Sequence, residues 1–353
     1  MNLFPGGRKS LIVALFLLGT CCGCNRPAGP IFENNRPELS WPPPPHPARI
    51  QYVGAIRTAD DLKPPRRTGE ILERIFGGRK PPEPLYGPRA ATVTSDGNKV
   101  WVADPGGRCV HFFNLESRAY RKIEGSGPQR LLTPVAVCPG AAGSVFVCDS
   151  EAVAIHRLSD RDGSWLESLR LPEELQRPVA LHYDESSQEL FVLDVLGHDI
   201  KVFDAQGGVT RIIGTRGVQP GEFNFPTAIA ADSDTLWIAD TGNHRIQGIR
   251  RDGSPVFVFG QAGDASGDLA MPKGVAVDGE GHIYVVDGRF ENIQIFSQTG
   301  ELLLYFGEEG SGAGQFWLPG GIWIERRGRI WVCDTYNRRL QVFQYVGDLD
   351  ADF

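Results

Sequence analysis

The sequence predicts an all-β chain folded as a six-bladed β-propeller, and three observations support this fold class. An apolar run that ends in aspartate occurs six times, with 45, 45, 46, 47 and 47 residues between successive aspartates. An aromatic residue stands three positions before each aspartate, and a proline stands about fifteen positions before it. A near-constant period of this length, made of short strands and turns, is typical of four-stranded propeller blades.

Each aspartate and its aromatic residue belong to one predicted strand. The aspartates are Asp104, Asp149, Asp194, Asp240, Asp287 and Asp334. The aromatic residues are Trp101, Phe146, Phe191, Trp237, Tyr284 and Trp331. Neighbouring blades cover both faces of such a strand, so it is continuously apolar and its ring fills the wedge between blades. The carboxylate at its end is expected to accept hydrogen bonds from loop amides.

The innermost strand of each blade is predicted from the proline and a small residue two positions after it. The prolines are Pro88, Pro134, Pro178, Pro226, Pro272 and Pro319. The small residues are Ala90, Ala136, Ala180, Ala228, Gly274 and Gly321. Innermost strands crowd around the central axis of a propeller, which favours alanine and glycine at these positions.

The fourth and sixth repeats resemble the NHL repeat. They read Asp240-Thr-Gly-Asn-His-Arg-Ile-Gln and Asp334-Thr-Tyr-Asn-Arg-Arg-Leu-Gln. The resemblance covers roughly residues 85–345, although the first three repeats depart from the Asn-x-Arg signature. It implies a six-bladed propeller, consistent with the six repeats, and it identifies a scaffold rather than an activity.

The N-terminus is predicted to be a secretory signal. Arg8 and Lys9 precede the apolar run Leu11–Leu18, which is too short to span a bilayer. The following residues resemble a bacterial lipobox, which implies a cleaved chain that begins with a lipid-bearing Cys21, or alternatively Cys24. We therefore expect an exported protein anchored by lipid to the cell envelope, at the outer membrane if two membranes are present. An ordinary cleaved signal remains the alternative.

The remaining segments flank the repeats. They are the signal 1–20, a proline-rich tether 21–48, a strand 49–56, a short amphipathic helix 68–78, the propeller 49–345 as a whole, and an acidic tail 346–353. The sixth repeat ends after its third strand, so strand 49–56 is expected to supply its outer strand and close the ring. The helix is expected to plug one side of the propeller, or alternatively to bind a partner.

Two kinds of loop are expected to lie on one face of the propeller, which we call the top face. One kind follows each aspartate, and the other joins an outer strand to the next inner strand. Predicted outer strands include Val209–Ile213, Val256–Phe259 and Leu302–Phe306. The top-face loops that follow them are long and span Gly214–Phe225, Gly260–Met271 and Gly307–Leu318. Long loops on one face of a rigid scaffold are where binding usually occurs.

The top-face loops of the last two blades carry a candidate binding cluster. It consists of Arg289, Phe290, Trp317, Tyr336 and Arg338. Aromatic residues and arginines are typical anchors of protein interfaces. The structural alternative is that these rings pack the loops against one another.

His198 and His244 occupy equivalent positions, four residues after their aspartates, and are the candidate top-face histidines. Some propeller enzymes, such as lactonases and amidating lyases, place metal ligands around the central channel. Such a site needs three or more converging ligands, and no such set is evident here. We therefore predict no metal and no catalytic residue. The alternative is an exported hydrolase or lyase that uses calcium or zinc.

Charge and cysteine content narrow the partners. The net charge of -7, with basic residues scattered among acids, argues against nucleic acid. Cys148 and Cys333 occupy a small, buried repeat position, and a disulfide between Cys138 and Cys148 is left open. The sequence thus predicts a monomeric, membrane-anchored, non-catalytic module that binds an envelope protein, peptide or polymer.

Overall fold

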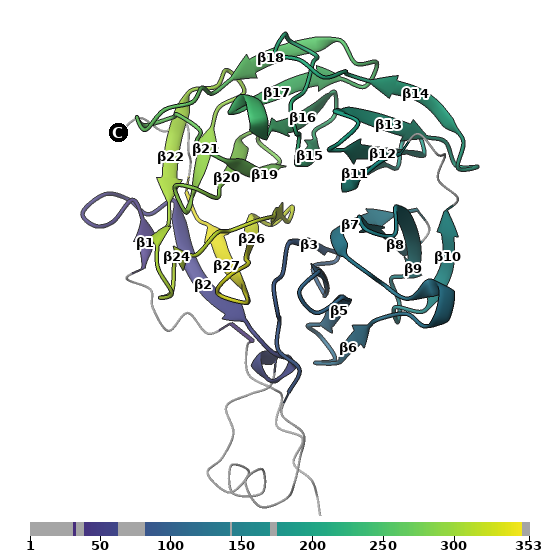
Figure 1. The fold of residues 1–353 in the computed structure, drawn as a ribbon. Helices are drawn as coiled ribbons and strands as arrows, with labels where there is room; N and C mark the ends of the chain where they lie inside the picture. The colour runs from purple at the N-terminus through teal and green to yellow at the C-terminus, as the bar shows by residue number, and fades with distance from the viewer. Residues whose placement is uncertain (1–30, 33–38, 63–81, 142, 170–174, 348–353) are drawn as a thin grey trace, which may run out of the picture.

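Six blades surround a central axis in the computed structural model (Figure 1). The structure describes residues 31–32, 39–62, 82–141, 143–169 and 175–347. The predicted signal peptide, both candidate lipidation cysteines, the predicted helix 68–78 and residues 348–353 of the predicted acidic tail lie outside these ranges. The predicted six-bladed, all-β fold is confirmed.

The strands of the first five blades run from the axis outward in chain order. Blade 1 contains β3 (Ala90–Val93), β4 (Lys99–Asp104), β5 (Cys109–Asn114) and β6 (Tyr120–Ile123). Blade 2 contains β7 (Pro134–Gly140), β8 (Ser144–Asp149), β9 (Ala154–Ser159) and β10 (Trp165–Leu169). Blade 3 contains β11 (Pro178–Asp184), β12 (Glu189–Asp194), β13 (Asp199–Phe203) and β14 (Val209–Ile213).

Blade 4 contains β15 (Ala228–Ala231), β16 (Thr235–Asp240), β17 (Arg245–Arg250) and β18 (Pro255–Phe259). Blade 5 contains β19 (Pro272–Val277), β20 (Ile283–Asp287), β21 (Asn292–Phe296) and β22 (Leu302–Phe306). Blade 6 is the exception, with the order β25 (Ile322–Ile324), β26 (Arg329–Asp334), β27 (Arg339–Tyr345), β2 (Ile50–Ile56) and β1 (Ser40–Trp41). The loops add β23 (Glu308–Glu309), β24 (Gln315–Phe316) and the 3₁₀ turns η1 (Ala59–Leu62), η2 (Gly127–Gln129) and η3 (Thr241–Asn243).

The two ends of the chain share blade 6, as predicted. Strand β2 pairs antiparallel with β27, from Ile50 opposite Tyr345 to Ile56 opposite Leu340. Ile50 and Ile56 are fully buried in two different core clusters. Strand β2 therefore packs into the cores on both sides of blade 6, and it also covers the open edge of β27.

The proline-rich segment before β2 differs from the prediction. Ser40 and Trp41 form β1 and extend blade 6, so the tether does not continue to residue 48. The Trp41 ring packs against Phe306 and Phe343, both at a centroid distance of 5.8 Å. The prolines that follow form a turn back to β2 instead of an extended spacer. Burial of one large ring outweighs the extended preference of the neighbouring prolines.

The predicted packing positions are confirmed. All six aromatic residues before the aspartates are buried between blades. All six small residues after the prolines line the cavity along the axis. Cys138, Cys148 and Cys333 are buried free thiols, as is Cys109. Cys138 faces Phe146 across the hairpin and Cys148 faces Ala136, so the two thiols left open for a disulfide are not opposite each other.

A recurring left-handed residue shapes every hairpin on the top face. It lies four positions after each aspartate, with φ between 48° and 56°. The six residues are Arg108, Val153, His198, His244, Glu291 and Arg338. This left-handed residue turns the chain into the third strand of each blade. A β-branched side chain is unfavourable in this conformation, and Val153 is the one β-branched residue among the six.

Candidate functional site

The six strand-ending aspartates hold the top-face loops in place. Each is fully buried, and each carboxylate accepts hydrogen bonds from loop amides, as predicted. In blade 2, for example, Asp149 accepts from the backbone of Leu132 at 2.7 Å and of Thr133 at 2.9 Å. The aspartates therefore fix the loop that enters their own blade, and their lone pairs are already occupied.

Blades 4 and 6 reinforce this arrangement with the Asn-x-Arg signature. Arg339 is 1% exposed and donates from Nε to Asp334 at 2.7 Å. Its remaining nitrogens donate to the backbone carbonyls of Ser311, Gly312 and Gln315. Arg245 repeats this pattern in blade 4. One guanidinium thus orders the long loop that enters blade 4 and another orders the long loop that enters blade 6, which is the role of the signature here.

Two of the predicted binding residues form an exposed aromatic pair on these ordered loops. Trp317 is 51% exposed and Tyr336 is 56% exposed, with ring centroids 5.5 Å apart. The Trp317 amide donates to Asp334 at 2.8 Å, and the Tyr336 amide donates to the Trp317 carbonyl at 3.1 Å. The rings are therefore held together by a fixed backbone while much of their surface faces solvent.

The other three cluster residues lie on the same loops. Arg289 and Arg338 are exposed, and Phe290 is half-buried. The backbone amides of Arg289 and Phe290 donate to Asp287, which places both in the hairpin turn of blade 5. Within the described part of the chain, no ring contact joins Phe290 to the aromatic pair. The aromatic pair is thus the centre of the cluster.

The two candidate histidines each bond to the loop that enters the following blade. His198 is buried, and its Nδ1 accepts from the Phe225 amide at 3.1 Å while the two rings pack at 4.7 Å. His244 Nδ1 donates to the Ala270 carbonyl at 2.8 Å. Nδ1 therefore carries a proton in His244 and none in His198. Both imidazoles thereby link neighbouring blades.

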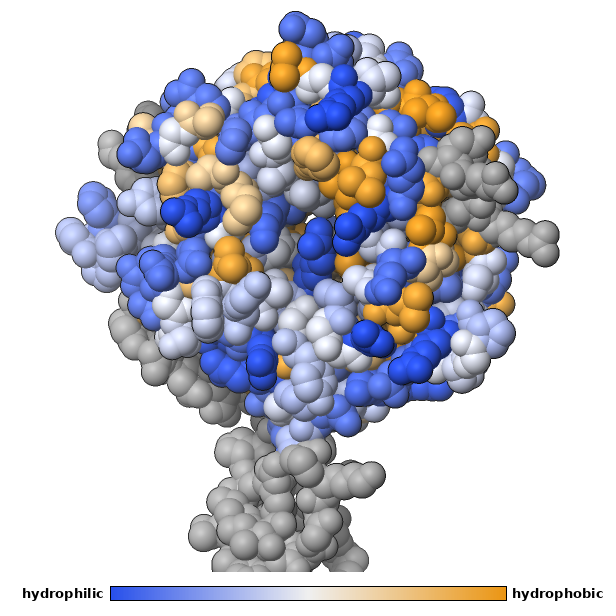
Figure 2. Space-filling model, in the orientation of Figure 1, coloured by the Kyte–Doolittle hydropathy of each residue, from blue (hydrophilic) through white to orange (hydrophobic). Residues whose placement is uncertain are grey.

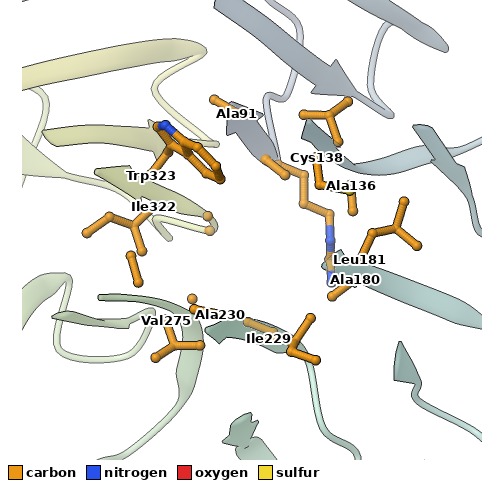
Figure 3. A pocket seen from close by; sticks show the side chains of 18 of the residues that line it. Ala91, Ala136, Cys138, Ala180, Leu181, Ile229, Ala230, Val275, Ile322 and Trp323 are labelled. Carbon is orange, nitrogen blue, oxygen red and sulfur yellow. The ribbon is translucent and has the colours of Figure 1, made fainter. Parts of the chain in front are cut away.

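A cavity of about 780 Å³ runs along the axis between the inner strands. Its walls are mostly small or apolar, as Figure 3 shows for Ala136, Ala180, Val275, Ile322 and Trp323. Hydrophilic residues lie beside the centre of the ring on the face drawn in Figure 2. A cavity of this size is in the range that holds small molecules.

Two cationic residues line this cavity where the inner strands begin, Arg89 just before β3 and Lys273 in β19. Burial lowers the pKa of the Arg89 guanidinium below its usual value. Burial, and then the charge of Arg89, lower the pKa of Lys273. Glu185 and Arg326 lie at the other end of the inner strands and also line the cavity. The cavity thus combines apolar walls with concentrated positive charge.

The described residues lack the features of two other classes of site. They contain no group of three or more His, Cys, Asp or Glu side chains arranged to hold a metal ion. Nor does any helix within the described ranges have the length and apolar character needed to cross a bilayer.

Comparison with known proteins identifies the repeat. A family model described as NHL repeat matches residues 223–249, which include the end of the loop entering blade 4, strands β15 and β16 and most of β17. Human NHL repeat-containing protein 3 is 33% identical over 123 residues, which cover 31% of this chain and 35% of that protein. The chain is a six-bladed β-propeller with an NHL repeat in blade 4. It spans about a third or less of the length of the curated relatives it matches.

Solved structures share the architecture of this propeller. Virginiamycin B lyase from Staphylococcus aureus superposes with a TM-score of 0.54 and 17% identity, covering 74% of this chain and 96% of that one. An auxiliary nutrient binding protein from Bacteroides thetaiotaomicron gives a TM-score of 0.58 and 15% identity, covering 74% and 69%. At these identities the likeness shows the fold alone.

Sequence reasoning missed Arg89 and Lys273. Each stands directly after the proline that leads into an inner strand, so the repeat register is sufficient to find them.

Proposed function

We propose that this NHL propeller is an exported, lipid-anchored and non-catalytic module that binds a protein, peptide or envelope polymer on its top face. The observation that carries the proposal is the exposed pair of Trp317 and Tyr336 on an ordered backbone. Binding energy in protein interfaces is concentrated in a few aromatic and arginine residues near the centre of the contact. Arg289 and Arg338 supply exposed cations on the same face.

The physical argument is preorganisation. Ordering a flexible loop during binding costs free energy that is subtracted from the affinity. Here Asp334 and Arg339 fix the loop that carries Trp317, and Thr335 donates to the Pro88 carbonyl of blade 1 at 2.8 Å. The pair is therefore presented without such a cost. A rigid aromatic surface of this kind favours a partner with apolar or ring-stacking groups.

The N-terminal sequence supports the location. The basic residues, the short apolar run and the lipobox-like cysteines indicate export and lipid attachment at Cys21, with Cys24 as the alternative. An anchor of this kind would hold the top face near other envelope components. The partners we propose are accordingly envelope proteins, peptides or polymers, with the propeller itself monomeric.

Alanine substitution of both rings tests the proposal. Trp317→Ala combined with Tyr336→Ala is expected to reduce capture of the native envelope partner by at least about tenfold, because two anchors are removed. Capture is measured by crosslinking in intact cells followed by quantitative mass spectrometry. The melting temperature should change little, since both rings are half exposed.

The matched control is Tyr305→Ala, which removes a ring that is 55% exposed on the outer strand β22. That variant should capture the partner as well as the parent does. A double variant with lower stability and unchanged capture would show that the rings only pack the loops.

A further inference from the structure

We propose that the axial cavity is a binding site for a small organic carboxylate, whose anionic group contacts Arg89 and Lys273 and whose apolar body lies against the inner strands. Tyr336 of the aromatic pair also lines this cavity, but the contacts proposed here are with Arg89, Lys273 and the inner strands, and the proposal does not depend on the function proposed above. It rests on the placement of two cations, on their lack of partners and on the walls around them.

The two cations occupy equivalent positions in a ring of six residues at the top of the cavity. Each follows the proline of its blade, and the ring consists of Arg89, Val135, Val179, Thr227, Lys273 and Gly320. Blade 6 lies between the two cationic blades and contributes only the glycine. A Cβ added to Gly320 would lie 3.1 Å from the Arg89 carbonyl oxygen, so the backbones of blades 6 and 1 meet closely. Between the two cationic blades the ring therefore carries no side chain.

Neither cation has an anionic partner in the described part of the chain. No hydrogen bond or ion pair involves the side chain of Arg89 or Lys273 there, although the structure pairs most other partly buried cations with carboxylates. Holding two like charges in a confined space without a counter-charge costs free energy. A bound anion would offset that cost, which gives the arrangement a physical rationale.

The backbone that carries the two cations is fixed from neighbouring blades. Thr335 of blade 6 donates to the carbonyl of Pro88, directly before Arg89, at 2.8 Å. Thr241 of blade 4 donates to the carbonyl of Pro272, directly before Lys273, at 2.6 Å. The two threonines follow the aspartates of the two blades with the strongest repeat signature. The same motif therefore holds both cations in position.

The walls select the rest of the ligand. Below the ring the cavity presents Ala91, Ala230, Ile322 and Trp323, with Trp323 the only aromatic side chain labelled in Figure 3. Such walls favour an aliphatic or aromatic body over a polyhydroxylated one. The planar guanidinium of Arg89 matches a carboxylate, with Lys273 as a second point charge. An arylalkanoate combines these features.

Calorimetric titration of the purified full-length chain with 4-phenylbutyrate tests the proposal. 4-Phenylbutanol has no carboxylate, and acetate has no apolar body. Each should bind at least about tenfold more weakly than 4-phenylbutyrate, because each lacks one of the two groups that the site recognises. Inorganic phosphate provides the comparison for an anion of higher charge without an apolar body.

Single substitutions locate the site. Arg89→Gln and Lys273→Gln should each weaken binding of 4-phenylbutyrate by roughly tenfold, and Lys273→Arg should retain most of it. Arg130→Gln, at an exposed position outside the cavity, is the charge-matched control and should bind as the parent does. Melting temperatures of the ligand-free Gln variants should equal or exceed that of the parent, because an unpaired charge is removed from the cavity.

Three results would overturn the proposal. The first is that no binding of 4-phenylbutyrate is detected at ligand concentrations up to roughly 10 mM, which is in the Kd range of a weak fragment complex. Another is equal affinity for the acid and the alcohol, or tighter binding of phosphate than of the acid. The third is unchanged affinity in both Gln variants that melt as the parent does. If one variant fails to fold, the other decides the matter.

Discussion

Replacing Arg339 with alanine is expected to destabilise the propeller by about 3–5 kcal/mol, the usual result of removing one partner from a buried ion pair. The substitution leaves Asp334 fully buried without its cation and releases three loop carbonyls. The free energy of unfolding, measured by urea denaturation, gives the effect directly.

Arg338→Ala is the matched control, because Arg338 adjoins Arg339 in the chain but is exposed. It should change the free energy of unfolding by less than about 0.5 kcal/mol. Arg339→Lys should be intermediate, since an ammonium keeps the charge but cannot reproduce the fork of contacts. Equal stability of the Arg339→Ala variant and the parent would contradict the role assigned to the signature.

The deficit of the Arg339→Ala variant should also depend on pH. Burial already raises the pKa of Asp334 in the folded chain above its usual value. A carboxyl with a raised folded-state pKa binds protons more readily when folded, so stability rises as pH falls toward that pKa. Loss of the cation strengthens this effect. The stability gap to the parent should therefore narrow between pH 7 and pH 4.

Deleting residues 47–57 is expected to lower the melting temperature by roughly 10 °C or more. The deletion removes β2 from blade 6, together with the fully buried Ile50 and Ile56, and exposes the edge of β27. Exposed edges pair with other chains, so the variant should also associate in solution. Differential scanning calorimetry and light scattering measure the two effects.

If the deletion of residues 47–57 prevents folding, a single substitution in β2 tests the same role of the strand. Ile56→Ala should cost about 2–5 kcal/mol, since it leaves a cavity in the core between blades 6 and 1. A synthetic peptide of residues 39–57 should restore part of the lost stability to the deletion variant. An unchanged melting curve after deletion would rule out closure of the ring by the N-terminal strand.

Most of the fold was predictable because its repeat is regular. The aspartate, aromatic and proline registers placed every blade, and the incomplete sixth repeat required a strand from elsewhere, which strand 49–56 supplies. The boundary of the tether was not predictable in this way. Strand β1 exists because the Trp41 ring fits between Phe306 and Phe343, a contact across more than two hundred residues.

The candidate sites were predictable only in part. Trp317 and Tyr336 could be paired from the topology, since neighbouring loops of one blade must lie close together. The position of Phe290 apart from that pair depends on how the hairpin of blade 5 turns, which the sequence pattern does not specify. The sequence alone did not predict that Arg89 and Lys273 lie near each other. They belong to different blades, and they come close only when the propeller closes.

Site-specific photo-crosslinking tests most directly whether the top face is the binding surface. A photoreactive phenylalanine analogue is placed at Trp317, at Tyr336 or at the exposed control position Tyr305, in the full chain expressed in its native envelope. We predict one reproducible adduct from the two top-face positions, absent from Tyr305 and reduced by unlabelled competitor chain. The same adducts from all three positions, or none from Trp317 and Tyr336, would contradict a binding surface at this pair.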